Sequence, residues 1–508
     1  MSSADDITHY DPVEGYAGRL SYVAGDEVTL HVSSRAAVFD VTIHRFGARR
    51  ELVWEATRCA GVEQSTPDDA DARGCGWTPS LRFIVPASWR SGFYLVTFHP
   101  GDGSISHACF VVRGSGARAL LVLATNTYQA YNTWGGRSLY TGATQVSFRR
   151  PFGRGLLDRP ATERDDRKSR PTHRGEDPDV DGHLYQQYRY RHGYPGYLGS
   201  TGWFAYERRF VEWAEAEGVQ LDYAISTDLG AIDLSEYDVI ISAGHDEYWS
   251  WEQRDAIEAF VGGGGNHISM SGNTCFWQVR VEDGGDAMVC HKYSAHVTDP
   301  AGRRMTGMWS DPLVDRPETA FLGAGSAWGL YARFGQATPR GSGAFTVYRD
   351  DHWLFAGTGL RYGDLLGAHD GVVGYETVGC RLAFDDYQLP IAAGGDGTPP
   401  DIDVVAFTPA SNLQRGEYPA SIAALADQGD LEFIASRLAG RVDADSVSRF
   451  RHGNAVMVVC RPFGAEGGEV VTIGSTDWVF GLGDPIVAQV TRNALAHCMR
   501  DAAGAVGR

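Results

Sequence analysis

Positive charge is scarce in this sequence. Its 508 residues include 45 Lys and Arg against 64 Asp and Glu, a formal net charge of −19. Nucleic acids and anionic membranes attract basic surfaces, so this charge argues against either as the main partner. The sequence also lacks an apolar run of membrane-spanning length, and its first residues, MSSADDITHYDPVEGY, lack the basic start and apolar centre of a secretory signal. We therefore expect a cytoplasmic protein.

Paired cysteines are absent as well. The eight cysteines are scattered and include no CxxC pair, which argues against a structural zinc site. Cys59 and Cys75 flank an acidic loop and could approach one another, but thiols in a reducing cytosol stay free. We expect free cysteines.

The length and the spacing of apolar residues predict several domains. A chain of 508 residues exceeds what one compact core supports. Residues 1–115 show short alternating strands and predict a β-sandwich. Residues 116–295 predict a doubly wound parallel sheet resembling a glutamine-amidotransferase-like fold, with an irregular insertion at 153–200 that suits a lid or a subunit contact. Residues 296–508 predict a β-rich region that rejoins the central sheet, so the fold class is α/β with all-β additions.

The segment 237–273 is the most informative. A short apolar run at 239–243 is typical of a buried strand and leads into Gly244-His245-Asp246-Glu247-Tyr248-Trp249. Ser250 then suits the N-cap of a helix to about residue 261. A second buried strand ends at Ser271-Gly272-Asn273. Ligands of open parallel sheets bind beyond the carboxyl ends of the strands, so His245, Glu247 and Asn273 should share one crevice.

A second strand end also carries polar and aromatic residues. The buried run 119–124 is followed by TNTYQAYNTWGG at 125–136, which we interpret as a ligand-binding loop. The alternative is a loop whose aromatic side chains only cover the sheet. Near the other end of the chain, the run 469–475 repeats the pattern of a buried strand ending in polar residues.

The residue types at these strand ends allow more than one chemistry. His245 and Glu247 should project to the same side of an extended segment, where they could share a metal or act as an acid/base pair. Alternatively, Glu247 caps the following helix and His245 is a half-buried polar residue. Cys275 could be a thiol nucleophile with His245 or His267 as base, although the glycine-flanked nucleophile elbow is missing. A non-catalytic carbohydrate- or partner-binding protein would also fit.

Several sequence blocks resemble the large (beta) subunit family of N,N-dimethylformamidase. The matching blocks, in order, are TNTYQAYNTWGG (125–136), VEWAEAEG (211–218), LDYAISTDL (221–229), YDVIISAGHDEYWS (237–250), GGGGNHISMSGN (262–273), GYE (374–376) and GSTDW (474–478). The resemblance implies a hydrolase that cleaves the C–N bond of a small or N-substituted amide, with one iron ion held by two tyrosine phenolates and a glutamate. It also implies a small partner subunit, and it leaves open a homo-oligomer.

The resemblance carries over to individual residues. Glu247 of HDEYW matches the glutamate ligand, and Tyr131 of AYN is the choice for one phenolate. His245 matches the neighbouring histidine, which would move protons. Asn273 matches a polar residue lining the pocket and could donate to the developing oxyanion. Glu376 matches an acidic partner. The second tyrosine has no counterpart by motif; Tyr185 and Tyr188 lie in the insertion and could substitute for it.

Overall fold

The computed structural model describes residues 11–159, 191–195, 197–299, 301–329, 343–409 and 429–499. The chain divides into two compact units: unit 1 comprises residues 1–166, 186–232 and 279–291, and unit 2 comprises residues 167–185, 233–278 and 292–508. The fold is mixed α/β and rich in strands. The three predicted domains and the two predicted fold types, sandwich and glutamine-amidotransferase-like, stay predictions. Tyr185 and Tyr188 lie outside the described residues.

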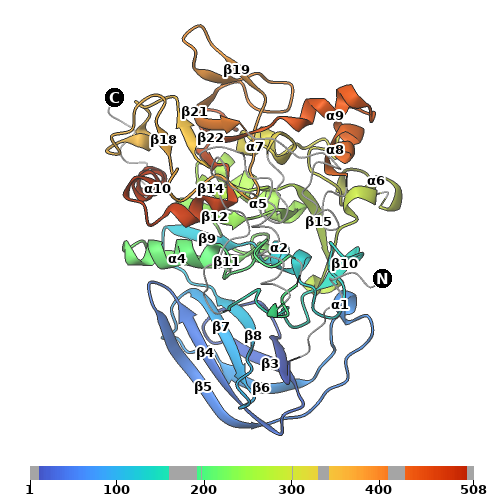
Figure 1. The fold of residues 1–508 in the computed structure, drawn as a ribbon. Coiled ribbons are helices and arrows are strands. Elements are labelled where there is room, and N and C mark those ends of the chain that lie inside the picture. Colours follow the sequence, from blue (N-terminus) through green and yellow to red (C-terminus); the bar gives the residue numbers. More distant parts are fainter. Residues whose placement is uncertain are drawn as a thin grey trace. The chain divides into compact units, whose positions relative to one another are not determined.

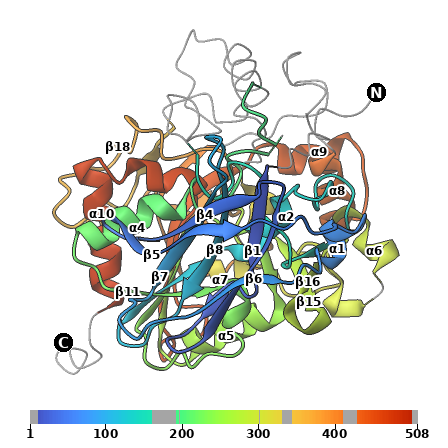
Figure 2. The same ribbon diagram turned by 90° about the horizontal axis from the view of Figure 1, so that it is seen from below.

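Two sheets form the N-terminal part of unit 1, drawn in blue in Figure 1 and seen from below in Figure 2. The three-stranded sheet has the order β1 (Val13–Ala17), β3 (Glu27–Ser34) and β6 (Pro79–Ile84). The five-stranded sheet has the order β2 (Ser21–Tyr22), β8 (Ser106–Val112), β7 (Gly92–His99), β4 (Val38–Phe46) and β5 (Arg50–Ala60). Both sheets contribute to one apolar core, with Leu30 from the first and Ile43 from the second fully buried.

The rest of unit 1 contains a parallel strand pair and the helices after it. β9 (Ala119–Leu123) pairs in parallel with β11 (Leu221–Ile225), and both strands are entirely buried. The remaining elements are α1 (Ala70–Arg73), α2 (Thr125–Tyr131), α4 (Glu207–Ala216), β10 (Gln145–Ser147), β15 (Trp277–Glu282, mostly in this unit) and β16 (Ala287–Val289). β16 pairs antiparallel with both β10 and β15.

Two local predictions in unit 1 need correction. The segment after β9 is not a loop throughout, because its first seven residues form α2 and are all buried. Buried backbone groups need hydrogen-bond partners, and a helix supplies them internally. The sequence also predicts a helix from about Trp203 to Glu217, followed by Gly218 as its stop signal, but the helix begins only at Glu207. Trp203 stacks on Phe93 with ring centroids 4.0 Å apart, and Tyr206 has non-helical backbone angles, so residues 203–206 form a buried turn instead.

Unit 2 is built on a larger sheet. Its strands follow the order β12 (Val239–His245), β14 (Asn266–Gly272), β23 (Val470–Ile473), β22 (Asn454–Cys460), β21 (Ile402–Pro409), β17 (Phe345–Val347) and β18 (Leu365–Leu366). The first three strands are parallel and the others pair antiparallel. β23, although nearly 200 residues further along the chain, therefore lies directly beside β14.

Helices and short strands complete unit 2. They are β13 (Tyr248–Ser250), α5 (Trp251–Gly262), α6 (Ala295–Thr298), α7 (Thr319–Leu322), the hairpin of β19 (Leu382–Phe384) and β20 (Pro390–Ala392), α8 (Asp430–Leu438), α9 (Ala444–Arg451) and α10 (Pro485–Cys498). α5 and α10 pack against β14 (Figure 1). The eight cysteines are free thiols, as expected. Among the described residues, no helix combines the length and the apolar character that a bilayer crossing requires.

A buried histidine in the core of unit 2 should make the unfolding free energy depend on pH. His267 on β14 is fully buried, and burial lowers its pKa from 6.5 to about 4. Below pH 6.5 the unfolded chain binds a proton that the folded chain does not, so stability falls as the pH drops from 6.5 to 4, by about 3 kcal/mol. We expect His267→Gln to lose this part of the pH dependence of the unfolding free energy, measured by denaturant titration. His369→Gln, at a side chain that is 89% exposed, is the control; equal pH slopes for His267→Gln and the wild type would contradict the prediction.

Candidate functional site

A histidine and two glutamates meet at the carboxyl end of β12. His245 is the last residue of this strand, and Glu247 follows two residues later. His245 Nε2 lies 3.3 Å from Glu247 Oε2 and 2.6 Å from Glu376 Oε2. One ligand atom from each of the three side chains lies within 4.8 Å of the others, and all three residues are buried. The structure thus joins the HDE segment to a residue more than a hundred positions downstream.

Asn273 belongs to the same cluster. It directly follows β14, whose Gly272 lies opposite His245 in the parallel register. The Asn273 side-chain amide donates a hydrogen bond of 3.0 Å to Glu376 Oε2. Four of the five predicted site residues, all but Tyr131, therefore converge within unit 2.

The backbone of Glu376 is fixed by Thr476, three residues after the end of β23. The Thr476 N–H donates to the Glu376 carbonyl at 3.0 Å, and the Glu376 N–H donates to Thr476 Oγ1 at 3.3 Å. Thr476 Oγ1 in turn donates to the carbonyl of Gly374 at 2.8 Å. On the other side lies Gly272, where an added Cβ would overlap the Glu376 carbonyl oxygen. The GYE and GSTDW blocks of the sequence thus form one clamp, which orients Glu376 toward His245.

Three residues around the cluster have left-handed backbone conformations. Asn273, Cys275 and Tyr375 have φ values of 52°, 56° and 46°. Such conformations cost about 1–3 kcal/mol for residues other than glycine and persist where the surroundings enforce them. The turn after β14 is enforced by hydrogen bonds, since the Cys275 N–H donates to the carbonyl of Asp246 at 2.9 Å and the N–H groups of residues 276 and 277 donate to that of Glu247 at 3.0 Å.

Tyr375 is a site residue that sequence reasoning missed. Its ring meets the imidazole of His245 edge-on, with centroids 5.7 Å apart and planes at 88°. This contact restricts the orientation of the imidazole. The only sequence signal was its place beside Glu376 in the GYE block, which says nothing about which way the ring points.

The middle residue of the HDE segment has a different environment. Asp246 is fully buried, and burial raises the pKa of its carboxyl group to about 6. Its Oδ2 accepts a hydrogen bond of 2.8 Å from Ser242 Oγ, and its N–H donates to Ser271 Oγ at 3.2 Å. Asp246 therefore ties the end of β12 to β14.

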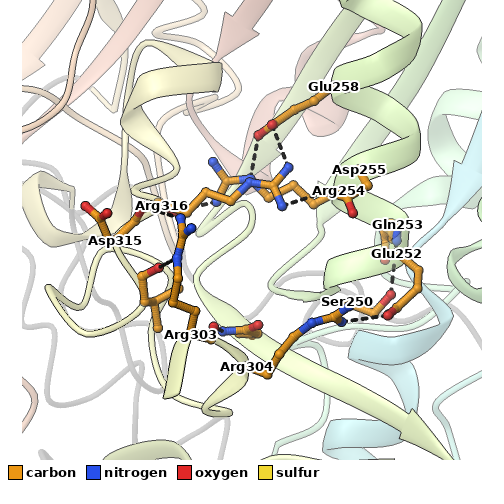
Figure 3. Close-up of polar contacts among 12 residues, drawn as sticks. Ser250, Glu252, Gln253, Arg254, Asp255, Glu258, Arg303, Arg304, Asp315 and Arg316 are labelled. Atoms are coloured by element: carbon orange, nitrogen blue, oxygen red, sulfur yellow. Dashed lines mark hydrogen bonds and ion pairs between the residues drawn. The ribbon is translucent and has the colours of Figure 1, made fainter. Parts of the chain in front are cut away.

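Helix α5 anchors the other end of the HDEYWS segment (Figure 3). Ser250 is its N-cap, as predicted, and its side chain accepts the N–H of Gln253 at 3.1 Å. Along the helix, Arg254 donates to Glu258 at 2.6 Å and to the carbonyls of residues 316 and 317. The start of α5, four residues after Glu247, is thus fixed by its N-cap and by the hydrogen bonds of Arg254.

Three arginines of the segment 303–316 contact side chains in the first turns of α5 (Figure 3). Arg304 pairs with Glu252 at 2.6 Å, and Arg316 pairs with Asp255 at 2.7 Å. The guanidinium groups of Arg303, Arg304 and Arg316 lie 5.7, 4.9 and 4.8 Å from the centroid of the Trp251 ring. Because the acidic residues of α5 balance these arginines, we interpret the contacts as structural support rather than as an anion site.

Tyr131 lies in unit 1, as the last residue of α2. Tyr140 donates its hydroxyl proton to the Tyr131 hydroxyl oxygen at 2.7 Å. The Tyr131 ring also lies 4.2 Å from the ring of Tyr140 and 5.7 Å from that of Tyr197, measured between centroids. The sequence singled out Tyr131 but not this group of three phenols.

A buried arginine holds the segment after α2. Arg150 is fully buried, and its guanidinium group donates to the backbone carbonyls of residues 129, 132, 134, 137 and 147. Burial lowers its pKa to about 10, so it stays charged at neutral pH. A cation at a helix C-terminus is favourable, and here it also fixes the loop that connects Tyr131 with Tyr140.

The candidate thiol nucleophile is in a poor environment for reaction. Cys275 is 1% exposed, and burial raises the pKa of its thiol well above the ordinary value. A reactive cysteine needs a lowered pKa and access to substrate. Both observations argue against nucleophilic catalysis by Cys275.

Comparison with known proteins identifies the relatives of the chain. The family model described as "N,N-dimethylformamidase beta subunit-like, C-terminal" matches residues 40–493. The chain belongs to this family. Among curated proteins, the N,N-dimethylformamidase beta subunit of Paracoccus aminophilus is 25% identical over 233 residues, and that of an Alcaligenes species is 26% identical over 231 residues.

The match to these relatives is partial. In each case it covers 41% of this chain and 28% of the relative. The chain therefore matches less than a third of the length of the curated dimethylformamidase subunits, and membership of the family does not by itself transfer their activity.

The close approach at Gly272 gives a testable prediction. In Gly272→Ala the new Cβ overlaps the Glu376 carbonyl, so we expect a loss of about 1–3 kcal/mol in unfolding free energy and a longer distance between His245 and Glu376 in a crystal structure. Gly483→Ala is the matched control, because the Cβ there meets open space. The interpretation fails if Gly272→Ala matches the control in stability and leaves Glu376 in place.

Proposed function

We propose that this protein is a metal-dependent amidohydrolase that cleaves a small or N-substituted amide, with iron as the metal. The observation that carries the proposal is the buried cluster of His245, Glu247 and Glu376, with ligand atoms within 4.8 Å of one another. Family membership supports the amide as substrate class, because the curated relatives are named as dimethylformamidase subunits.

The residues of the cluster suit a cation. Two carboxylates buried this close repel each other, and a proton or a metal ion between them removes that repulsion. Carboxylate oxygen and imidazole nitrogen are good ligands for iron, and ligands about 2.1 Å from one ion lie roughly 3 Å apart when adjacent. The 3.3 Å separation of His245 and Glu247 agrees with this geometry.

Two alternative sets of residues could bind the proposed ion, and Glu247 belongs to both. In the set taken from the resemblance, Glu247 and Tyr131 bind the ion, while His245, Glu376 and Asn273 act on the substrate. The second phenolate of this set stays unassigned, because Tyr185 and Tyr188 lie outside the described residues. In the set taken from the cluster alone, His245 and Glu376 complete the site. We propose the first set, in which the cluster supplies one ligand, Glu247, together with the acid–base pair of His245 and Glu376, and the resemblance supplies the phenolate of Tyr131.

The mechanism assigns one task to each side chain. A bound iron ion would polarise the amide carbonyl and lower the pKa of water. His245 takes a proton from the attacking water and gives it to the departing amine, and Glu376, 2.6 Å away, stabilises the imidazolium formed in between. The Asn273 amide has two N–H donors, so one can hold Glu376 while the other donates to the developing oxyanion.

The other functions considered have less support. The buried, protonated thiol of Cys275 argues against a cysteine hydrolase. A non-catalytic binding protein has no need of two buried carboxylates beside a histidine. A partner subunit and a homo-oligomer remain predictions from the resemblance.

Removing the shared ligand tests the proposal. We expect Glu247→Gln to bind no iron and to lose amide hydrolysis by at least about a thousandfold while keeping the wild-type unfolding transition. Elemental analysis and release of amine from dimethylformamide and related amides are the measurements. Glu252→Gln, at an exposed ion pair on α5, is the control; iron retained at wild-type stoichiometry in Glu247→Gln would refute the assignment.

A second variant tests the phenolate. Iron–phenolate centres absorb visible light by charge transfer, so we expect iron-loaded wild type to show such a band. Tyr131→Phe should weaken the band and shift its maximum, since one of the two phenolates is removed. Tyr94→Phe is the control, since Tyr94 is a buried tyrosine of β7 whose hydroxyl donates to a backbone carbonyl. An unchanged band in Tyr131→Phe would remove Tyr131 from the ligand set.

A further inference from the structure

Unit 2 contains a cavity that the proposed function does not use. Its volume is about 650 Å³, within the range of small-molecule sites. Its described walls come from residues 310–319, residues 327–328, Arg381 and Asp396 near the β19–β20 hairpin, and the carboxyl-terminal ends of α8 and α9. All of these residues belong to unit 2, and none belongs to the candidate metal cluster.

A buried carboxyl group lines this cavity without an ion pair. Glu318 is 1% exposed, and its Oε1 accepts the N–H of Ser326 at the long distance of 3.3 Å. Its Oε2 and the Oγ of Ser310, another lining residue, are buried and have no hydrogen-bond partner among the described residues. Asp311, in contrast, pairs with Arg437 at 2.5 Å. Because an unpaired buried oxygen is unfavourable, Glu318 favours a ligand that brings N–H donors.

A second carboxylate of the lining lies beside Glu318. Asp396 accepts the N–H of Arg381 at 2.8 Å and that of Thr398 at 3.1 Å, and its carbonyl accepts the hydroxyl of Thr319 at 2.6 Å. Within the described part of the chain, Asp396 forms no ion pair. The cavity thus holds two neighbouring carboxyl groups that no cationic side chain neutralises directly.

The protonation of Glu318 supports a place for a cation. Burial raises the pKa of its carboxyl group to about 7; the charge of Asp396 raises it too, whereas Arg254 and the N–H of Ser326 lower it. Asp315, the other acidic residue near Glu318 in the lining, is exposed. Glu318 is therefore partly protonated at neutral pH. An ammonium group beside it would favour the ionised form and release a proton.

The same lining also holds a cation that forms no ion pair with the described residues. Arg381 is exposed, and its guanidinium group donates to the carbonyl of Gly394 at 3.0 Å and lies 6.0 Å from the centroid of the Trp328 ring. The other lining arginine, Arg449, pairs with Asp445 at 2.8 Å. The remaining donors of Arg381 suit the two oxygens of a carboxylate.

Aromatic and aliphatic side chains complete the described lining. The rings of Trp328 and Phe450 lie 5.1 Å apart between centroids, and both pack with Ala327 and Leu438 in one apolar cluster. Their surface suits an apolar group. An α-amino acid with an apolar side chain combines the three features that this lining matches: an ammonium group, a carboxylate and an apolar body.

We propose that this cavity binds an α-amino acid with an apolar side chain, its ammonium group held by Glu318 and Asp396, its carboxylate by Arg381 and its side chain by Trp328 and Phe450. The charged groups are neighbours, because the Arg381 N–H bonds to Asp396 and the Asp396 carbonyl bonds to the residue after Glu318. Arginine suits the carboxylate because its planar donors match both oxygens.

Titration calorimetry of the wild-type protein with L-phenylalanine tests the proposal. Two analogues each lack one charged group: 3-phenylpropionate lacks the ammonium group, and 2-phenylethylamine lacks the carboxylate. We expect saturable binding of phenylalanine, at least about tenfold tighter than that of either analogue.

Two variants assign the charged groups. Glu318→Gln should weaken phenylalanine at least about tenfold and leave 3-phenylpropionate unchanged, whereas Arg381→Met should weaken phenylalanine as much and leave 2-phenylethylamine unchanged. Arg82→Met, at an exposed arginine paired with Glu27, is the control and should bind phenylalanine like the wild type. Because Arg381 is exposed, its replacement keeps the test decisive if Glu318→Gln does not fold.

Proton release gives a readout that a structural role would not produce. Calorimetry of the wild-type protein at pH 7, in two buffers of different ionisation enthalpy, should show a proton released on phenylalanine binding, and Glu318→Gln should lose this release. No saturable binding of phenylalanine, an analogue that binds as tightly, wild-type affinity in Arg381→Met, or binding without proton release would each overturn the proposal.

Discussion

Two buried carboxylates beside one imidazole set the central physical constraint of unit 2. Glu247 and Glu376 both lie within hydrogen-bond or ion-pair distance of His245 Nε2, in a place with almost no access to water. Burying like charges this close is unfavourable unless a positive charge lies among them. Several specific contacts nevertheless hold Glu247 and Glu376 close together. The cation that we propose at this site would supply that positive charge.

The surrounding backbone is arranged to keep this cluster intact. Thr476, just after β23, fixes the chain around Glu376, and the missing side chain of Gly272 lets that chain approach β14. The turn after β14 accepts two left-handed residues, Asn273 and Cys275, in order to return its N–H groups to the carbonyls of Asp246 and Glu247. Backbone strain of this kind is concentrated where a fixed geometry matters for function.

The sequence predicted those parts of the site that depend on local pattern. Buried apolar runs located β12 and β14, and the polar residues at their ends identified His245, Glu247 and Asn273, because parallel strands bring their carboxyl ends to one edge. Glu376 came only from the family resemblance, since no local signal joins residue 376 to residue 245.

Long-range packing decided what the sequence could not predict. The edge-on contact of Tyr375, the clamp from Thr476 and the hydrogen bond between Tyr140 and Tyr131 involve residues brought together by the fold. The same reason explains the two wrong local predictions. Trp203 stacks on Phe93 and lies outside the helix predicted to begin there. The polar segment after β9 forms helix α2, whose internal hydrogen bonds satisfy its buried backbone.

Anomalous X-ray diffraction from crystals of the iron-loaded protein, collected on both sides of the iron absorption edge, tests the central claim most directly. The account predicts one strong anomalous peak within bonding distance of Glu247, beside His245 and Glu376. A peak at other residues, or none at this cluster in protein shown to carry iron, would contradict it.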